Sequence, residues 1–101
     1  MAISDIEEKG NYLKVFDENG KKVSELYVSG LDLLGIGEDF FVVEKGSYYQ
    51  TYDEHSKKIA ELYASGLSFK SASGSSFNVQ KGSYMITYDR HCKKVGERYS
   101  H

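Results

Sequence analysis

The side chains that could take part in binding recur at a fixed interval in this sequence instead of gathering in one segment. A glutamate and a tyrosine occupy the same two positions of three related segments. These six residues are Glu25, Glu61, Glu97, Tyr27, Tyr63 and Tyr99. A carboxylate accepts hydrogen bonds, and a Tyr side chain offers both an aromatic face and a hydroxyl group. The six residues are therefore the candidate ligand-binding residues, in up to three equivalent sites.

Two hypotheses explain the three glutamates. In an extended strand, Ile59 and Tyr63 share the face of Glu61, so we expect a partly buried carboxylate, which needs hydrogen-bond partners. Tyr hydroxyls and the ammonium groups of Lys21, Lys57 and Lys93 are natural donors, and such a bond would fix strand register. Alternatively, the carboxylates converge on a pseudo-threefold axis, where repulsion raises their pKa values or recruits Ca²⁺.

Other polar residues are interpreted as parts of turns. Asp17, Asp53 and Asp89 each end a strand-like run, where an Asp side chain accepts hydrogen bonds from the backbone of its own turn. His55, His91, Cys92 and His101 follow no zinc-ligand spacing, so we predict no metal site and no cofactor. They are expected to be exposed loop residues, including the Cys92 thiol.

No enzyme activity is predicted. The sequence contains no recognisable pairing of a nucleophile with a base, and "GLDLLGIG" lacks the Lys-Ser/Thr ending of a phosphate-binding loop. Catalysis also requires different residues in different roles at one site. Three near-identical segments offer three near-identical surfaces, an arrangement suited to multivalent binding.

The three segments form an internal repeat of 36 residues. Gly10, Gly46 and Gly82 mark its period, and adjacent copies are identical at 13 of 23 aligned positions. Eight positions agree in all three copies: Lys9/45/81, Gly10/46/82, Tyr12/48/84, Asp17/53/89, Lys21/57/93, Lys22/58/94, Glu25/61/97 and Tyr27/63/99. We predict one domain over residues 1–101, with copies at about 4–39, 40–75 and 76–101.

Each copy alternates in hydrophobicity with a period of two, which indicates β-strands. Hairpins are expected near Asn19-Gly20, His55-Ser56 and His91-Cys92, because Asn-Gly between alternating runs is a strong hairpin signal. One unit is then a four-stranded antiparallel meander of "FFVVE", "SYYQTYD", "KKIAELY" and "LSFKSA". The third copy ends before its fourth strand, and Asp5 and Glu7 disrupt the first strand of copy one.

The predicted fold is therefore all-β, built from three repeated meanders in a prism-like or propeller-blade-like arrangement, with a rolled barrel as a further alternative. The outline resembles that of the threefold bulb-type mannose lectins. Their sugar-binding motif, Gln-x-Asp-x-Asn-x-Val-x-Tyr, is absent, because Lys45 and Lys81 stand where its acid belongs. No family and no sugar site are assigned on this resemblance.

The composition limits which classes of partner the protein can bind. A net charge of −2 gives no basic surface for nucleic acid, and no apolar run approaches the roughly 20 residues that span a bilayer. A single Cys and an N-terminus without signal-peptide features favour a cytoplasmic protein. We predict a small non-catalytic interaction or scaffold module, or alternatively a lectin-like protein that binds carbohydrate. Irregular terminal copies with exposed strand edges predict self-association, most simply as a dimer.

Overall fold

The computed structural model describes residues 3–99, which form eleven antiparallel β-strands in three sheets and no helix. The N-terminal sheet consists of β1 (Ile3–Lys9), β2 (Tyr12–Asp17) and β3 (Lys22–Tyr27). The middle sheet consists of β4 (Leu31–Ile36), β5 (Phe40–Lys45), β6 (Tyr48–Asp53) and β7 (Lys58–Tyr63). The C-terminal sheet consists of β8 (Ser68–Ser73), β9 (Ser76–Lys81), β10 (Tyr84–Asp89) and β11 (Lys94–Tyr99). Within these residues, no helix could cross a membrane.

The predicted all-β fold of repeated meanders is confirmed, but the strands are shared between sheets differently from the expected unit. β4 and β8 were expected to close the preceding meander, yet β4 pairs with β5 and β8 pairs with β9. The turn that ends in Leu31 or Leu67 therefore leads from one sheet into the next. As a result the C-terminal sheet has all four strands, and the N-terminal sheet is the one with three.

The hairpins lie where they were predicted, and the repeated aspartates hold them. In the first hairpin, Asp17 Oδ1 accepts hydrogen bonds from the backbone N–H groups of Asn19 (2.9 Å) and Lys21 (3.0 Å). The same two bonds recur at Asp53 and Asp89. The position occupied by Gly20 has a positive φ in every copy, and Ser56 and Cys92 adopt it at 62° and 61°.

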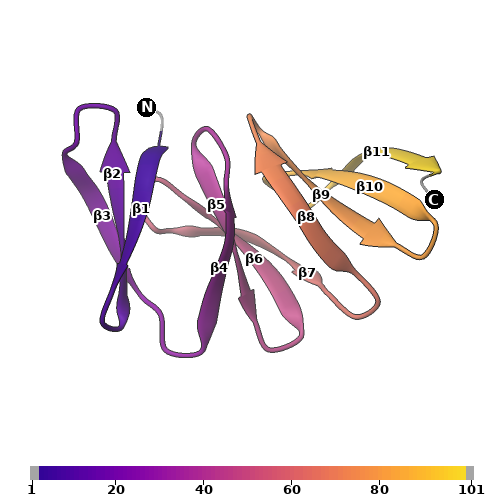
Figure 1. Ribbon diagram of the computed structural model, residues 1–101, viewed down its shortest axis with the longest axis horizontal. Helices are drawn as coiled ribbons and strands as arrows, with labels where there is room; N and C mark the ends of the chain where they lie inside the picture. Colours follow the sequence, from indigo (N-terminus) through magenta and orange to yellow (C-terminus); the bar gives the residue numbers. More distant parts are fainter. Residues whose placement is uncertain (1–2, 100–101) are drawn as a thin grey trace.

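The three sheets stack face to face in a row, which gives a molecule with extents of 40 × 26 × 20 Å (Figure 1). This arrangement corresponds to the propeller-blade-like alternative, without the single sheet that a barrel requires. We call the side of each sheet that looks toward the N-terminal end its leading face, and the opposite side its trailing face. In the middle sheet, Phe41 and Val43 lie on the leading face, and Phe40 and Val42 lie on the trailing face.

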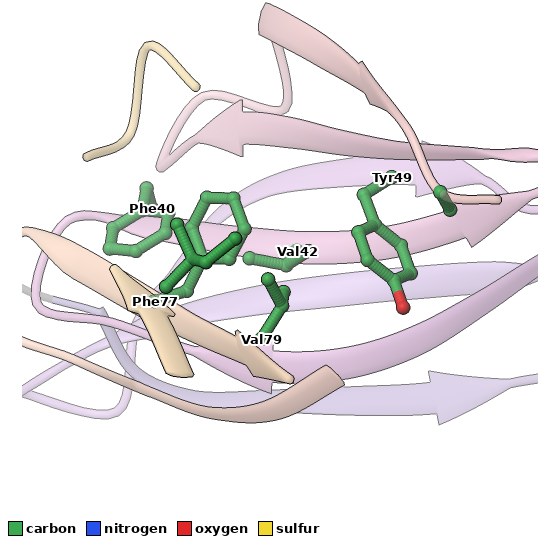
Figure 2. Close-up of a cluster of buried hydrophobic side chains, with 7 residues drawn as sticks. Phe40, Val42, Tyr49, Phe77 and Val79 are labelled. Atoms are coloured by element: carbon green, nitrogen blue, oxygen red, sulfur yellow. The ribbon is translucent and has the colours of Figure 1, made fainter. Parts of the chain in front are cut away.

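One apolar core fills each of the two spaces between sheets. Leu13 and Val15 from the N-terminal sheet pack against Phe41 and Val43, and all four are at most 1% exposed. The second core joins the middle and C-terminal sheets. It contains Phe40, Val42, Tyr49, Phe77 and Val79 (Figure 2). Stacking is therefore driven mainly by burial of apolar side chains from alternate positions of each strand.

The residues of the first strand-like run explain where each sheet sits in the stack. β5 is apolar on both faces, because Phe40 to Val43 are all fully buried. In β1 the two residues equivalent to Phe41 and Val43 are Asp5 and Glu7, which are exposed. The N-terminal sheet therefore has a polar leading face, so only its trailing face packs against a neighbour.

In the C-terminal sheet the polar residues are on the other face, the trailing one. In β9, Phe77 and Val79 keep the leading face apolar, while Asn78 and Gln80 occupy the trailing face. The Asn78 side chain is satisfied within its own sheet, since it donates to Ser71 Oγ (3.1 Å) and accepts from Thr87 Oγ1 (2.6 Å). Both end faces of the stack are thus polar.

Hydrogen bonds between sheets hold each hairpin against the preceding sheet. Ser24 Oγ donates to the Glu54 carbonyl (2.6 Å), and Thr51 Oγ1 donates to the Arg90 carbonyl (2.6 Å). Glu54 and Arg90 are equivalent residues, although the two donors come from different strands. The same backbone contact is therefore made twice by different side chains, which fixes how far one sheet is rotated on the next.

Candidate functional site

Five of the eight invariant positions gather on the leading face of each sheet. The exceptions are the Asp and the first Lys of the hairpin turn, and the Gly of the tight turn between the first and second strand-like runs. The five form what we call the Tyr–Lys–Glu cluster. Its members are Lys9, Tyr12, Lys22, Glu25 and Tyr27 in the N-terminal sheet, Lys45, Tyr48, Lys58, Glu61 and Tyr63 in the middle sheet, and Lys81, Tyr84, Lys94, Glu97 and Tyr99 in the C-terminal sheet.

A pair of exposed tyrosines marks one end of every cluster. The members of a pair lie directly opposite each other on adjacent strands. Ring centroids are 5.6 Å apart for Tyr12–Tyr27, 5.4 Å for Tyr48–Tyr63 and 5.7 Å for Tyr84–Tyr99, all in edge-to-face geometry. The six side chains are 41% to 62% exposed. Each pair therefore presents a fixed aromatic surface to solvent, because its rings order each other.

An ion pair forms the other end of each cluster. Lys22 Nζ lies 3.0 Å from Glu25 Oε1, and the same contact is 3.0 Å in Lys58–Glu61 and 3.1 Å in Lys94–Glu97. The Lys22 ammonium lowers the pKa of Glu25 chiefly by hydrogen bonding. Hydrogen bonds from Lys58 and then Gln50 lower the pKa of Glu61. Glu25 and Glu61 therefore stay charged at neutral pH.

The expectation that these glutamates are partly buried and bonded to the first Lys of each pair is wrong. Their side chains are 37% to 39% exposed, and the partner is the second Lys. The cause is a bulge in the outer strand. Ser24 pairs with Val15 and Lys22 pairs with Phe16, so Val23 is skipped and Lys22 moves onto the face of Glu25. The other two sheets contain the same bulge.

The alternative in which the three carboxylates converge is also wrong. They lie on three successive sheets of the stack, and each has its own Lys partner. Within residues 3–99, no group of three or more His, Cys, Asp or Glu side chains is arranged to hold a metal ion. The clusters are therefore separate surfaces.

The floor beneath the clusters differs between sheets. Lys14 and Phe16 form it in the N-terminal sheet, and Gln50 and Tyr52 form it in the middle sheet. There Tyr52 Oη donates to Gln50 Oε1 (3.0 Å), and Gln50 Nε2 donates to Glu61 Oε1 (3.1 Å). The amide of Gln50 thus bridges a tyrosine and the glutamate of the cluster.

In the C-terminal sheet the floor is Ile86 and Tyr88, and the surface there is hollowed. A groove of about 530 Å³ is lined by Ile86, Tyr88, the tight turn 81–83 and three further cluster residues. These three are Tyr84, Lys94 and Glu97. Volumes of roughly 300–1,000 Å³ are typical of small-molecule sites. This cluster therefore has a concave surface.

The predicted loop residues divide into two groups. His55 and His91 are exposed in their hairpins, and His101 lies outside the described residues. Cys92 was expected to be exposed, but it packs partly buried against the second core. Burial raises the pKa of its thiol to about 11, so the thiol is a poor nucleophile at neutral pH.

Sequence reasoning identified two of the five cluster positions as binding residues and missed the other three. Tyr12 and its equivalents are invariant in the repeat, but their contact with Tyr27 depends on strand register. The second Lys is displaced by the bulge, which no pattern of alternation shows. The invariance of these positions was the available signal. No family model matches this chain, and no curated protein or solved structure is significantly similar to it.

Proposed function

We propose that the protein is a small, non-catalytic interaction module that presents the Tyr–Lys–Glu cluster to its partner once on each sheet. The observation that supports this proposal is the placement of the invariant residues. Five of the eight positions shared by all copies lie together on the leading face near the outer strands, and the tyrosines among them are strongly exposed.

The core shows the reverse pattern. Leu13 is replaced by Tyr49, and Val15 is replaced by Thr51, although all four are buried. If packing alone maintained the similarity of the copies, buried positions would be retained and exposed ones would diverge. Here the exposed cluster residues are retained in all three copies, while these buried positions vary. A common ligand or a repetitive partner surface accounts for this pattern.

A second candidate is the lectin-like function, which one feature of the cluster favours. Sugars bind to exposed aromatic rings through their apolar C–H faces and to charged side chains through their hydroxyl groups. The Tyr pair and the Lys–Glu pair provide both kinds of group on one surface. Up to three sugar units of one polymer could then occupy three clusters, with avidity beyond that of a single site.

The test compares binding by the wild-type chain and by a triple variant, Tyr27→Ala, Tyr63→Ala and Tyr99→Ala. Both proteins are applied to an array of immobilised glycans and to an array of peptides. The proposal predicts that the wild-type chain binds one class, and that the triple variant loses this binding at least about 100-fold because linked sites fail together. Binding to peptides supports the scaffold function, and binding to glycans supports the lectin-like function.

A matched control separates surface effects from loss of folding. Tyr49 packs edge-to-face on Phe69 in the second core, outside the Tyr–Lys–Glu clusters, so the single variant Tyr49→Phe keeps the ring packing and leaves every tyrosine pair and cluster intact. Circular dichroism melts confirm that all variants are folded. Unchanged binding by a folded triple variant rules out the clusters as the binding surface.

A further inference from the structure

The cluster of the C-terminal sheet lacks an internal bridge that the middle sheet has. In the middle sheet, the Gln50 amide accepts a hydrogen bond from Tyr52 and donates one to Glu61. Ile86 takes the place of Gln50 and cannot do either. Tyr88 and Glu97, the equivalents of Tyr52 and Glu61, both line the groove that this replacement opens.

We propose that this groove is a binding site for a sugar that carries a carboxylate, such as a uronic acid within an oligosaccharide. A sugar hydroxyl can accept a hydrogen bond from Tyr88 and donate one to Glu97, as the Gln50 amide does in the middle sheet. The ligand thus replaces a bridge that the protein builds elsewhere from its own side chain. This inference rests on the proposed function, since it assigns a ligand class to one of the three clusters.

The carboxylate follows from the charge of the groove. Two lysines and one glutamate line it, and Lys94 is paired with Glu97 at 3.1 Å. Among residues 3–99, Lys81 forms no ion pair. The groove therefore has one cation without an acidic partner, on the turn at its edge. A carboxylate placed there gains a charge-assisted hydrogen bond.

The composition of the groove favours a sugar over a hydrocarbon chain. Only Ile86 and the tyrosine rings are apolar, and the other side chains that line it are Lys81, Ser83, Lys94 and Glu97. A hydrocarbon ligand would desolvate these polar groups without replacing their hydrogen bonds. A sugar ring can lay its C–H face on Ile86 and the tyrosine rings and direct its hydroxyl groups toward the rim.

The experiment is a titration of the ¹⁵N-labelled full chain with trigalacturonate, with the neutral galactose trimer as the matched control. Saturable shifts in residues 81–97 are expected with the acidic trimer, and binding of the neutral trimer is expected to be about tenfold weaker or more. Lys81→Gln is expected to reduce affinity for the acidic trimer about tenfold and to remove the preference for it. A matched charge change outside the clusters, Lys57→Gln in the middle hairpin, is expected to leave both affinities unchanged.

Ile86→Gln provides a second variant, which recreates the internal bridge of the middle sheet and should abolish binding while Tyr88 and Glu97 remain. Ile86 belongs to the core, so Lys81→Gln keeps the test decisive if this variant is poorly folded. Equal binding of the two trimers, or the absence of saturable shifts in residues 81–97, overturns the inference. That result leaves the proposed function standing if the triple tyrosine variant still loses binding to another class of ligand.

Discussion

The middle sheet and the two end sheets share one antiparallel meander, with one strand fewer in the N-terminal sheet, but they have opposite relations to water. Both faces of the middle sheet are apolar, and its strand β5 has four consecutive residues, Phe40 to Val43, that are fully buried. Each end sheet is apolar on one face only. Asp5 and Glu7 make the outer face polar at one end, and Asn78 and Gln80 make it polar at the other. A few alternate positions thus determine the place of a sheet in the stack.

The comparison shows that repeated backbone geometry does not require repeated side chains in the core. Repeat arrays need polar outer faces on their terminal units, and this chain meets the requirement with substitutions in β1 and β9. The hairpins and the outer-strand bulges remain the same in all three sheets. The backbone plan and the solvent-facing cluster are therefore separable from the pattern of burial.

The largest effect is expected from giving the middle sheet a residue of the N-terminal sheet. Val43→Glu introduces the equivalent of Glu7 into a fully buried position without a charge partner, and it should cost about 4 kcal/mol or more of unfolding free energy. Urea denaturation followed by circular dichroism measures this loss. The reciprocal variant Glu7→Val should change stability by about 0.5 kcal/mol or less. Similar losses in both variants would contradict the assignment of the two faces.

A moderate effect is expected at a pair of equivalent threonines. Thr51 is fully buried, and its hydroxyl donates to the Arg90 carbonyl across the sheet interface at 2.6 Å. Thr51→Val should cost about 1–3 kcal/mol, because it leaves that carbonyl without its donor. Thr87 bonds only within its own sheet, to Asn78 on the outer face. Thr87→Val should therefore cost about 1 kcal/mol or less in the same urea experiment.

A smaller effect, equal in all sheets, is expected for the exposed tyrosine pairs. Tyr27→Ala, Tyr63→Ala and Tyr99→Ala should each cost about 0.5–1 kcal/mol, since each removes one edge-to-face cross-strand contact. Thermal melts of the three single variants provide the comparison. A cost at Tyr63 well above the other two would show that the middle sheet differs at its rim as well as in its core.

The smallest effect is expected in how the stability of the protein depends on pH. The Lys22 and Lys58 ammonium groups, chiefly by hydrogen bonding, lower the pKa values of Glu25 and Glu61, so the folded state binds protons less readily than the unfolded chain. Stability from these pairs is fully present above the ordinary glutamate pKa and is lost as the pH falls below about 4. Melting temperatures measured between pH 3 and pH 7 should therefore fall less in Glu25→Gln and in Glu61→Gln than in the wild-type chain. Both effects are small because the carboxylates are exposed, but Glu61 also accepts a hydrogen bond from Gln50, so Glu61→Gln should reduce the acid sensitivity more than Glu25→Gln. A larger reduction in Glu25→Gln would contradict this assignment.

Much of the fold was predictable from local signals. The period of 36 residues and the alternation of apolar residues predict the strands, and Asp17 with Gly20 predicts the first hairpin. Which strand joins which sheet was not predictable, because β4 could pair with either neighbour and only packing decides. The bulge at Val23 was also not predictable, and it reassigned the partner of Glu25. Self-association stays a prediction; the C-terminal sheet has all four strands, so the strand edge expected there is filled, while β1 remains an edge strand of the three-stranded sheet.

The contact between successive sheets joins two different surfaces, a trailing face and a leading face. Contacts of this head-to-tail kind do not end by themselves, and copies of such a molecule can add to one another as filaments or close into rings. A second molecule would have to dock on one of the two end faces. One of these faces carries the charged Asp5 and Glu7, and the other carries Asn78, whose side-chain amide is already hydrogen-bonded within its own sheet. The polar end faces thus protect the isolated chain against polymerisation. Replacing them with their counterparts from the middle sheet would turn this module into the subunit of a fibre.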